Sequence, residues 1–125
     1  MPTTRTTDAH QVWERYSQLW SMTDPAEREA AMVELLAPDC VYTDPTTRAT
    51  GHAEIGAYMD DFQDLLPGGG FEVTGFAAHH AQSLAEWNMV AADGTVAGTG
   101  ASHATYSAGG MLTSMTGFFD VPTDG

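Results

Sequence analysis

The stretch LLPGGGFEV, residues 65–73, separates two halves of the chain that differ in their hydrophobic pattern. Before it, apolar residues recur every three or four positions, which is the period of an amphipathic helix. After it, short β-prone runs are separated by turn residues, which is typical of strands. A proline followed by glycines ends a helix and lets the backbone turn. Helices that precede an antiparallel sheet along the chain indicate the α+β class.

The half before this stretch predicts three helices and one short strand. Thr7 and Asp8 are candidate N-caps of the first helix, and Asp24 is the candidate cap of the second. Pro38 is expected to stop the second helix because proline lacks an N–H donor. We expect helices near residues 9–22, 25–37 and 52–66, a strand at 40–44 and a loop at 45–50.

The half after this stretch predicts a meander of antiparallel strands. Residues 91–94 (AADG) and 107–110 (SAGG) are hairpin signals. Glycines inside the strands mark expected bends or bulges. These glycines are Gly75, Gly98, Gly100 and Gly117. The strands themselves are expected near residues 71–80, 83–91, 95–107 and 111–121.

The composition fits one domain spanning residues 1–125, with expected loose ends at 1–6 and 121–125. The chain has 17 acidic residues, four arginines and no lysine, for a net charge of −13. Such an acidic chain repels nucleic-acid phosphates and anionic membranes, so neither partner is expected. No apolar run is long enough to span a membrane, and the N-terminus lacks a signal-peptide pattern. The single Cys40 lies in an apolar run and predicts a buried thiol in the cytoplasm.

The stretch CVYTDP, residues 40–45, holds the first candidate site residue. Asp44 ends a β-prone run and precedes Pro45, a pattern typical of an Asx-turn. It could equally be a catalytic base at the mouth of a pocket, and the pattern alone leaves both interpretations open. Other polar candidates are Tyr16 on the first helix and, on the later strands, His79, His80, Ser102 and His103.

Several kinds of site are not expected. No residues have metal-ligand spacing, and adjacent His79 and His80 would point to opposite faces of a strand. The glycine-rich PGGG follows a helix and precedes a strand, the reverse of a phosphate-binding loop. No serine lies in a nucleophile elbow. We therefore expect neither a metal nor a cofactor.

Four motifs resemble the nuclear transport factor two superfamily, and more closely its ketosteroid-isomerase-like and SnoaL-like (polyketide cyclase) branch. The resemblance extends from about residue 9 to 121 and implies a cone-shaped α+β barrel: three helices packed in a strongly curved antiparallel sheet around an internal pocket. It also implies a homodimer. The motifs are ERYSQLW (14–20), ELLAPDCVYTDP (34–45), GHAEIGAYM (51–59) and AGGMLTSMTGFF (108–119).

The resemblance implies a role for individual residues. Asp44 matches the general base of the isomerases, and Tyr16 matches the tyrosine that hydrogen-bonds the developing enolate. The second acidic donor of the isomerases falls on Ser102, counted back from residues 114–115. Ser102 and its neighbour His103 face opposite sides of a regular strand, so only one of them can be the auxiliary group in the pocket.

The predicted function is acid–base chemistry on a small hydrophobic carbonyl compound, of isomerase or cyclase type. Loss of hydration in an apolar cone makes a carboxylate a stronger base. Strand periodicity places Trp87 inside, whereas a gap-free count against the isomerases would place Glu86 and Asn88 there. The expected pocket-lining residues are Trp20, Tyr58, Phe62, Trp87, Met115 and Phe119.

Other functions remain open on this fold. One is a non-catalytic binding module or accessory dimerisation module. A second is dehydratase chemistry like that of scytalone dehydratase, with tyrosines and histidines acting around a water. A third is epoxide hydrolysis, which uses an Asp–Arg–Asp set in this superfamily and is less favoured because no arginine is expected in the sheet.

Overall fold

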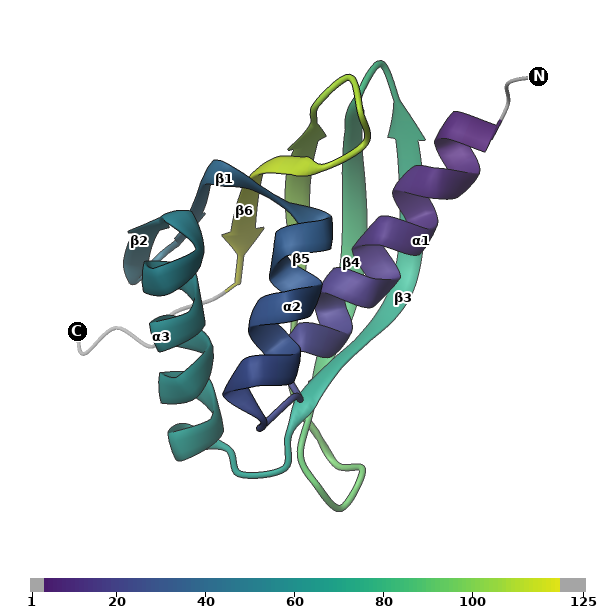
Figure 1. Cartoon of the computed structure of the whole chain (residues 1–125). Coiled ribbons are helices and arrows are strands. Elements are labelled where there is room, and N and C mark those ends of the chain that lie inside the picture. The colour runs from purple at the N-terminus through teal and green to yellow at the C-terminus, as the bar shows by residue number, and fades with distance from the viewer. Residues whose placement is uncertain (1–3, 120–125) are drawn as a thin grey trace.

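The computed structural model describes residues 4–119, and the side chains of residues 9–119. Figure 1 shows the helices gathered on one face of a single sheet. The elements in chain order are α1 Thr4–Leu19, α2 Pro25–Leu35, β1 Leu36–Asp44, β2 Thr47–Thr50, α3 Gly51–Leu65, β3 Gly70–His79, β4 Gln82–Val90, β5 Val96–Tyr106 and β6 Leu112–Phe118.

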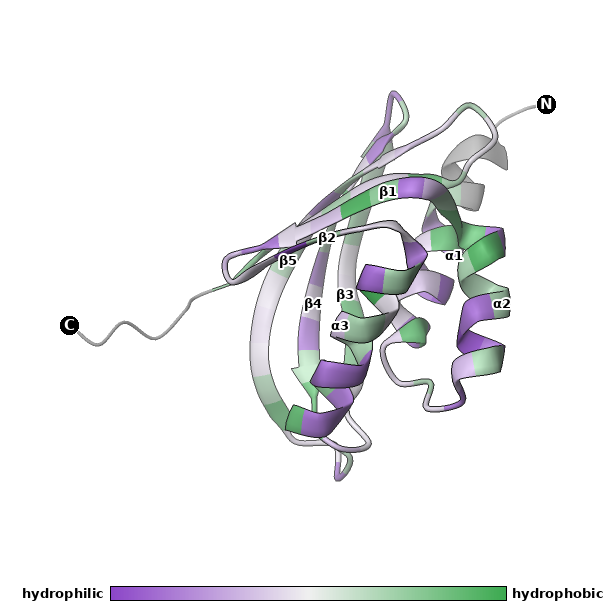
Figure 2. Ribbon diagram, turned by 60° about the vertical axis from the view of Figure 1, so that its left-hand side comes forward, coloured by the Kyte–Doolittle hydropathy of each residue, from purple (hydrophilic) through white to green (hydrophobic). Residues whose placement is uncertain are grey.

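The six strands of the described chain form one sheet in the order β2-β1-β6-β5-β4-β3. The sheet bends around the helices, and α3 lies inside the bend (Figure 2). α1 packs mainly against β3, and α3 packs against β1. The predicted α+β cone of three helices within a curved sheet is therefore confirmed. One pairing adds detail that the sequence did not specify: β1 runs parallel to β6, so the sheet is mixed.

The boundaries of α1 and β1 differ from the prediction. α1 already begins at Thr4, so Thr7 and Asp8 lie within the helix instead of capping it. Part of the segment 1–6, predicted to be loose, is thus helical, whereas residues 1–3 and 121–125 lie outside the described residues. β1 begins at Leu36 and includes Pro38, at a point where its register with β6 is irregular. A proline fits there because the missing N–H falls outside the regular ladder.

One turn differs from the prediction in its place, and another in its type. Instead of a loop at residues 45–50, the chain forms a tight hairpin in which β2 returns antiparallel to β1, with Asp44 opposite Thr47. The β3–β4 hairpin turns at His80 and Ala81, whose φ angles are 52° and 60°. The predicted strands at 71–80 and 83–91 place a break here, but this pair of positive φ values is typical of a type I′ turn, which usually needs glycine or asparagine, so the turn type was not predicted.

The core lies between the helices and the concave face of the sheet. The predicted helical stripes supply most of it, including Trp13, Leu19, Met32, Ile55 and Met59. Burial raises the pKa of the Cys40 thiol to about 11, so this free, buried cysteine is an unreactive core residue, as expected. No helix of the described chain is long and apolar enough to cross a membrane.

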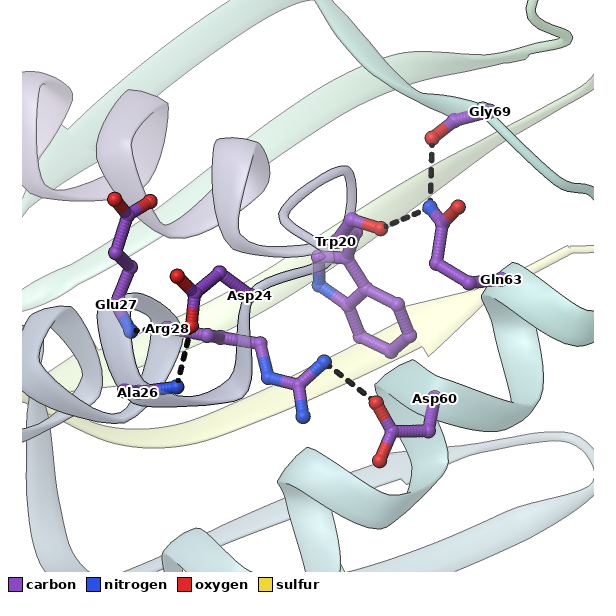
Figure 3. A network of polar contacts seen from close by, with 8 residues as sticks. All are labelled: Trp20, Asp24, Ala26, Glu27, Arg28, Asp60, Gln63 and Gly69. Carbon is purple, nitrogen blue, oxygen red and sulfur yellow. Dashed lines mark hydrogen bonds and ion pairs between the residues drawn. The ribbon is translucent and has the colours of Figure 1, made fainter.

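Polar contacts join the ends of the helices, as Figure 3 shows. Asp24 caps α2 through the N–H of Ala26, at 3.0 Å. The buried guanidinium of Arg28 donates to Asp60 on α3 at 2.8 Å. The Gln63 side-chain amide donates to the carbonyl of Trp20 at 2.6 Å and to that of Gly69 at 3.0 Å. These contacts fix the end of α1, which carries the aromatic residues described below, against α3.

We expect any side chain at Gly100 on β5 to destabilise the fold, because Trp87 occupies the space that a side chain would need. A Cβ at residue 100 would lie 2.5 Å from the Trp87 ring and 2.7 Å from the carbonyl oxygen of Phe118. We expect Gly100→Ala to lower the free energy of unfolding by about 1–3 kcal/mol, the usual cost of overpacking, in urea denaturation. Gly98→Ala is the matched control, since its Cβ meets only the flexible Met89 methyl at 3.4 Å. Equal stabilities of the two variants would contradict this packing.

Candidate functional site

Asp44 ends β1, and its carboxylate accepts hydrogen bonds on both oxygens. Oδ2 accepts from the hydroxyls of Tyr42 at 2.7 Å and Tyr58 at 2.8 Å. Oδ1 accepts from Thr46, through the backbone N–H at 2.8 Å and the hydroxyl at 3.1 Å. The contact with the N–H of Thr46 is an Asx-turn that closes the β1–β2 hairpin. Asp44 is therefore a turn former and also the centre of a polar cluster.

We call Asp44, Tyr42, Tyr58 and Thr46 the carboxylate cluster. Tyr42 precedes Asp44 by two residues on the same strand, so both side chains lie on the inner face of the sheet. Tyr58 comes from α3 and donates across the space between helix and sheet. The rings of Tyr42 and Tyr58 lie 5.5 Å and 5.8 Å from the ring of Trp20, centroid to centroid. The cluster thus joins β1, β2 and α3 against the end of α1.

A small cavity adjoins the carboxylate cluster between α1 and the sheet. It is partly open to the surface and offers about 30 Å³ of free space, room for about two water molecules. Asp44 is not part of the wall, but Tyr42 belongs both to the wall and to the cluster. The lining residues are Trp13, Tyr16, Ser17, Trp20, Tyr42, Phe71, Trp87 and Ser102. The site is accordingly apolar and aromatic, with hydroxyl groups as its polar components.

Ser102 on β5 faces this cavity and is only 8% exposed. Its hydroxyl oxygen accepts a hydrogen bond from the indole N–H of Trp87 at 3.0 Å. Because that bond uses a lone pair of the oxygen, the hydroxyl proton of Ser102 remains free to donate. The structure therefore gives Ser102 the geometry of a donor at the place where the resemblance puts the second acidic group.

Gly117 on β6 allows Ser102 to approach the carboxylate cluster. It pairs directly with Ser102 across the β5–β6 ladder. A Cβ at residue 117 would lie 3.6 Å from the Cβ of Asp44 and 3.7 Å from both the Ser102 hydroxyl and the Tyr42 hydroxyl. Asp44, Ser102 and Tyr42 thus surround this one position at distances of ordinary van der Waals contact.

The histidines lie away from the cavity. His103 faces the opposite side of the sheet from Ser102, and its Nε2 lies 3.1 Å from the side-chain oxygen of Gln82. Of the two candidates for the auxiliary group, Ser102 lines the cavity and His103 does not, so the candidacy of His103 is corrected. His79 and His80 are exposed beside the β3–β4 turn, with their Nδ1 atoms 2.9 Å apart.

Only part of the predicted pocket lining belongs to the wall. Trp20 and Trp87 line the cavity. Strand periodicity therefore placed Trp87 correctly, whereas Glu86, which the gap-free count placed inside, is exposed on the other face of the sheet. Tyr58 and Phe62 contact the indole ring of Trp20 edge to face but do not line the cavity. Met115 is buried in the core of β6, and Phe119 contacts the outer side of Trp87 at 6.1 Å between ring centroids. The large indole rings fill space that the sequence assigned to the pocket.

The tyrosines of the site are strongly perturbed. Burial raises the pKa of Tyr16 well above its usual value near 10, and the charge of nearby Asp44 raises it further. Burial also raises the pKa of Tyr42, with added contributions from Tyr16 and from the bond to Asp44. Burial raises the pKa of Tyr58, hydrogen bonds with Thr46 and Thr47 partly offset the rise, and Asp44 adds a smaller increase. All three hydroxyls therefore stay protonated and act as hydrogen-bond donors at neutral pH.

Other kinds of chemistry find less support in the described residues. Within residues 9–119, no group of three His, Cys, Asp or Glu side chains is arranged to hold a metal ion. Arg48 lies in β2, so the expectation that no arginine would fall in the sheet is wrong. Its side chain is exposed and is not part of the cavity wall. An Asp–Arg–Asp set around the cavity is therefore not formed.

A second, more open cleft of about 230 Å³ lies between α2 and α3. Arg28 and Met32 line it from α2, and His52, Gly56 and Asp60 line it from α3. The Arg28 guanidinium in its wall is already paired with Asp60. None of the predicted site residues lies in this cleft.

Sequence reasoning missed several members of the site. Tyr42 could have been found, because it shares a strand face with Asp44 at a spacing of two residues. Ser17 follows Tyr16 and gave no signal of its own, since a serine within a helix is common on any face. Trp13 and Phe71 were not predicted as site residues, and the structure shows that they line the cavity.

The fold and the site define an α+β cone of the nuclear transport factor two-like type, with a carboxylate and tyrosines beside an internal cavity. A family model described as the SnoaL-like domain matches residues 13–125, so the chain belongs to this family. No curated protein matches the chain.

Solved structures agree with this assignment at the level of the fold. A suspected isomerase of the SnoaL-like family from Agrobacterium tumefaciens is 22% identical, with a TM-score of 0.85, covering 92% of this chain and 99% of that one. A suspected SnoaL-like polyketide cyclase from Jannaschia is 13% identical, with a TM-score of 0.77, covering 96% and 90%. A ketosteroid-isomerase-like protein from Catenulispora acidiphila, solved with trimethylamine, is 16% identical, with a TM-score of 0.72, covering 88% and 85%.

The raised pKa values of the tyrosines predict sensitivity to alkaline pH. The pKa of Tyr106 is raised by burial as well, so all four tyrosines of the chain are affected. A pKa that is higher in the folded than in the unfolded state favours folding fully below the unfolded value, and this contribution falls as the pH rises above about 10.

We therefore expect no tyrosinate absorbance at 295 nm in the native protein at pH 10, and tyrosinate to form together with unfolding at higher pH. The guanidinium-unfolded protein is the control and should titrate near pH 10. Ionisation of the native tyrosines near pH 10, with the circular dichroism unchanged, would contradict the buried site.

Proposed function

We propose that this protein is a cofactor-free acid–base enzyme that removes a proton next to the carbonyl group of a small compound. The observation that carries the proposal is that Tyr42 links the Asp44 carboxylate, by a bond of 2.7 Å, to a small, apolar cavity that Tyr16 and Ser102 also line. A base and hydrogen-bond donors for the developing oxyanion are the minimum that this chemistry needs. The membership in the SnoaL-like family supports the same class of reaction.

The proposed reaction begins when the bond between hydrogen and the carbon next to the carbonyl breaks. The proton passes to Oδ2 of Asp44, and the electron pair moves onto the carbonyl oxygen as an enolate. Tyr16 and Ser102 donate hydrogen bonds to that oxygen in a site of low polarity, where such bonds are strongest. Return of the proton to another carbon completes an isomerisation, whereas attack of the enolate on a second carbonyl gives a cyclisation.

Tyr42 controls access to the base in this proposal. Its hydroxyl bonds Oδ2 at 2.7 Å and its side chain forms part of the cavity wall, so it stands between Asp44 and a ligand. The ligand must displace this hydroxyl to reach Oδ2. Tyr58 and Thr46 hold the carboxylate in place during the exchange, through bonds of 2.8 Å each. The same movement of Tyr42 would enlarge the cavity.

Dehydratase and epoxide-hydrolase chemistry are less well supported. A tyrosine–histidine mechanism lacks its histidine, because His103 faces away from the cavity. An epoxide-opening set lacks its arginine, because the side chain of Arg48 is exposed.

The proposal predicts that the protein catalyses exchange of ketone α-protons with deuterium from the solvent. Cyclopentanone and 2-pentanone are suitable probes, followed by proton NMR in D₂O. Asp44→Asn should slow the exchange by about 10²–10⁴-fold, the usual contribution of a general base. Tyr16→Phe should slow it by about 10²–10³-fold, as for the loss of an oxyanion donor.

Two matched variants control this experiment. Asp39→Asn removes an exposed acid from the same strand, and Tyr106→Phe removes a tyrosine that bonds Ser83 at 2.8 Å and does not line the cavity. Both should stay within about twofold of the wild type. Exchange that is as fast in Asp44→Asn as in the wild type would exclude Asp44 as the base.

A second candidate function is binding of a small organic cation without catalysis. The aromatic rings around the cavity, among them Trp20, Phe71 and Trp87, present the faces that attract alkylammonium groups. Asp44 and the net charge of −13 add a favourable field. The Catenulispora acidiphila protein, which shares the fold, was solved in complex with trimethylamine.

Calorimetric titration separates this candidate from the enzyme. Trimethylammonium should bind about tenfold or more tightly than tert-butanol, a neutral molecule of the same shape, if cation–π attraction operates. Asp44→Asn should reduce that preference, whereas Asp39→Asn should not. Equal affinities for the cation and the alcohol would rule this function out. Homodimer formation and a cytoplasmic location stay predictions of the sequence, the former testable by the mass in light scattering.

A further inference from the structure

Trp13 carries an unsatisfied hydrogen-bond donor at the cavity. The residue is 3% exposed, and its indole N–H is the one buried polar side-chain atom without a partner in the part of the chain whose side chains are described. A buried N–H without an acceptor loses its hydration and gains nothing in return, so such groups are rare in folded proteins. The contrast with Trp87 is direct, because that indole lines the same cavity and donates to Ser102.

The acceptor for this N–H can come from the cavity. Trp13 forms part of the cavity wall, and its one aromatic contact among the described rings is with Tyr16, tilted by 45° at 4.9 Å between centroids. We infer that the Trp13 N–H is a specificity-determining donor, which bonds a second acceptor atom of the ligand. This rests on the proposed function only in taking this cavity as the ligand site.

The other polar groups of the wall indicate the class of ligand. Tyr16 has a raised pKa and stays a donor, and Ser102 has its hydroxyl proton free. The strong acceptor nearby, the Asp44 carboxylate, already accepts hydroxyl bonds on both oxygens. A wall that offers donors on two sides is complementary to a small neutral molecule with two acceptor oxygens. A ketone with a second oxygen a few bonds away belongs to this class, and a simple ketone or an alkylammonium ion does not.

A pair of isosteric probes tests the inference. 2-Pentanone and methoxyacetone have the same chain length and differ by the replacement of one CH₂ group with an ether oxygen. The indole N–H signals of the three tryptophans are resolved in a nitrogen–proton correlation spectrum, and Trp13→Phe identifies the signal of Trp13 by its loss. Methoxyacetone should move the Trp13 signal downfield and bind about fivefold more tightly than 2-pentanone, the value of one net hydrogen bond. In Trp13→Phe the two affinities should become equal.

Trp87→Phe is the matched control, because it removes an indole N–H that already has a partner. In the ligand-free protein both variants lose the same ring volume and should melt at a lower temperature, but Trp13→Phe should lose less than Trp87→Phe, which also leaves Ser102 without its donor. Equal affinities of the two probes for the wild type, binding of neither, or a preference that survives in Trp13→Phe would overturn the inference. A melting temperature that falls as far in Trp13→Phe as in Trp87→Phe would also overturn it, since the Trp13 N–H would then have a partner within the protein. These experiments measure binding and stability, not catalysis. A negative result would therefore overturn the role of Trp13 without deciding whether Asp44 is the base, which the deuterium exchange tests.

Discussion

The hydrogen bonds from Tyr42 and Tyr58 to Asp44 hold the site and part of the fold together. A carboxylate drawn away from water is stable only where donors replace its hydration, and here three residues supply them. The donors come from a strand, a helix and a turn, so one charged group fixes β1, β2 and α3 relative to each other. Charge-assisted bonds of this length are stronger than those between neutral groups. Removal of the carboxylate would thus affect both structure and chemistry.

Two glycines of the sheet, Gly100 and Gly117, lie where side chains of neighbouring strands pack closely around this cluster and the cavity. Trp87 lies over Gly100, and Asp44, Ser102 and Tyr42 meet at Gly117. The curvature of the sheet brings these strands around α1, and the indole rings then fill most of the interior. The small cavity is what remains, so its shape follows from packing as much as from any requirement of a ligand. This explains why Phe62 and Met115, which face inward, still do not reach it.

Local patterns were sufficient to predict the fold class, because helix and strand periodicity and the PGGG break are read within a few residues. The parallel pairing of β1 with β6 joins segments about seventy residues apart, as Tyr42 and Met115 show. No local pattern encodes such a pairing. The choice between Ser102 and His103 depended on the register of β5, which shifts against β4 between Met89 and Val90. Such a bulge exchanges the two faces of a strand, so only the structure could decide which residue points inward.

The role of Asp44 could be predicted only in part. Its position before Pro45 predicted a turn, its place in the family predicted a base, and the structure shows both oxygens engaged, one by the turn and one by the tyrosines. This division suits an enzyme, because Oδ1 can stay fixed by Thr46 while Oδ2 exchanges partners. It also suits a binding protein, because a ligand that leaves the Tyr42 hydroxyl in place meets only rings and donors.

The two candidate functions therefore differ in one event, the displacement of the Tyr42 hydroxyl from Asp44. That displacement costs the free energy of a charge-assisted hydrogen bond, about 1.5–3 kcal/mol, which the ligand must recover from its own contacts. A ligand that also bonds the Trp13 N–H gains part of this free energy inside the cavity, whereas a ligand with a single acceptor gains less. Recognition of the second acceptor and access to the base are in this way energetically linked, so that the ligand held most firmly is also the one that can expose the base.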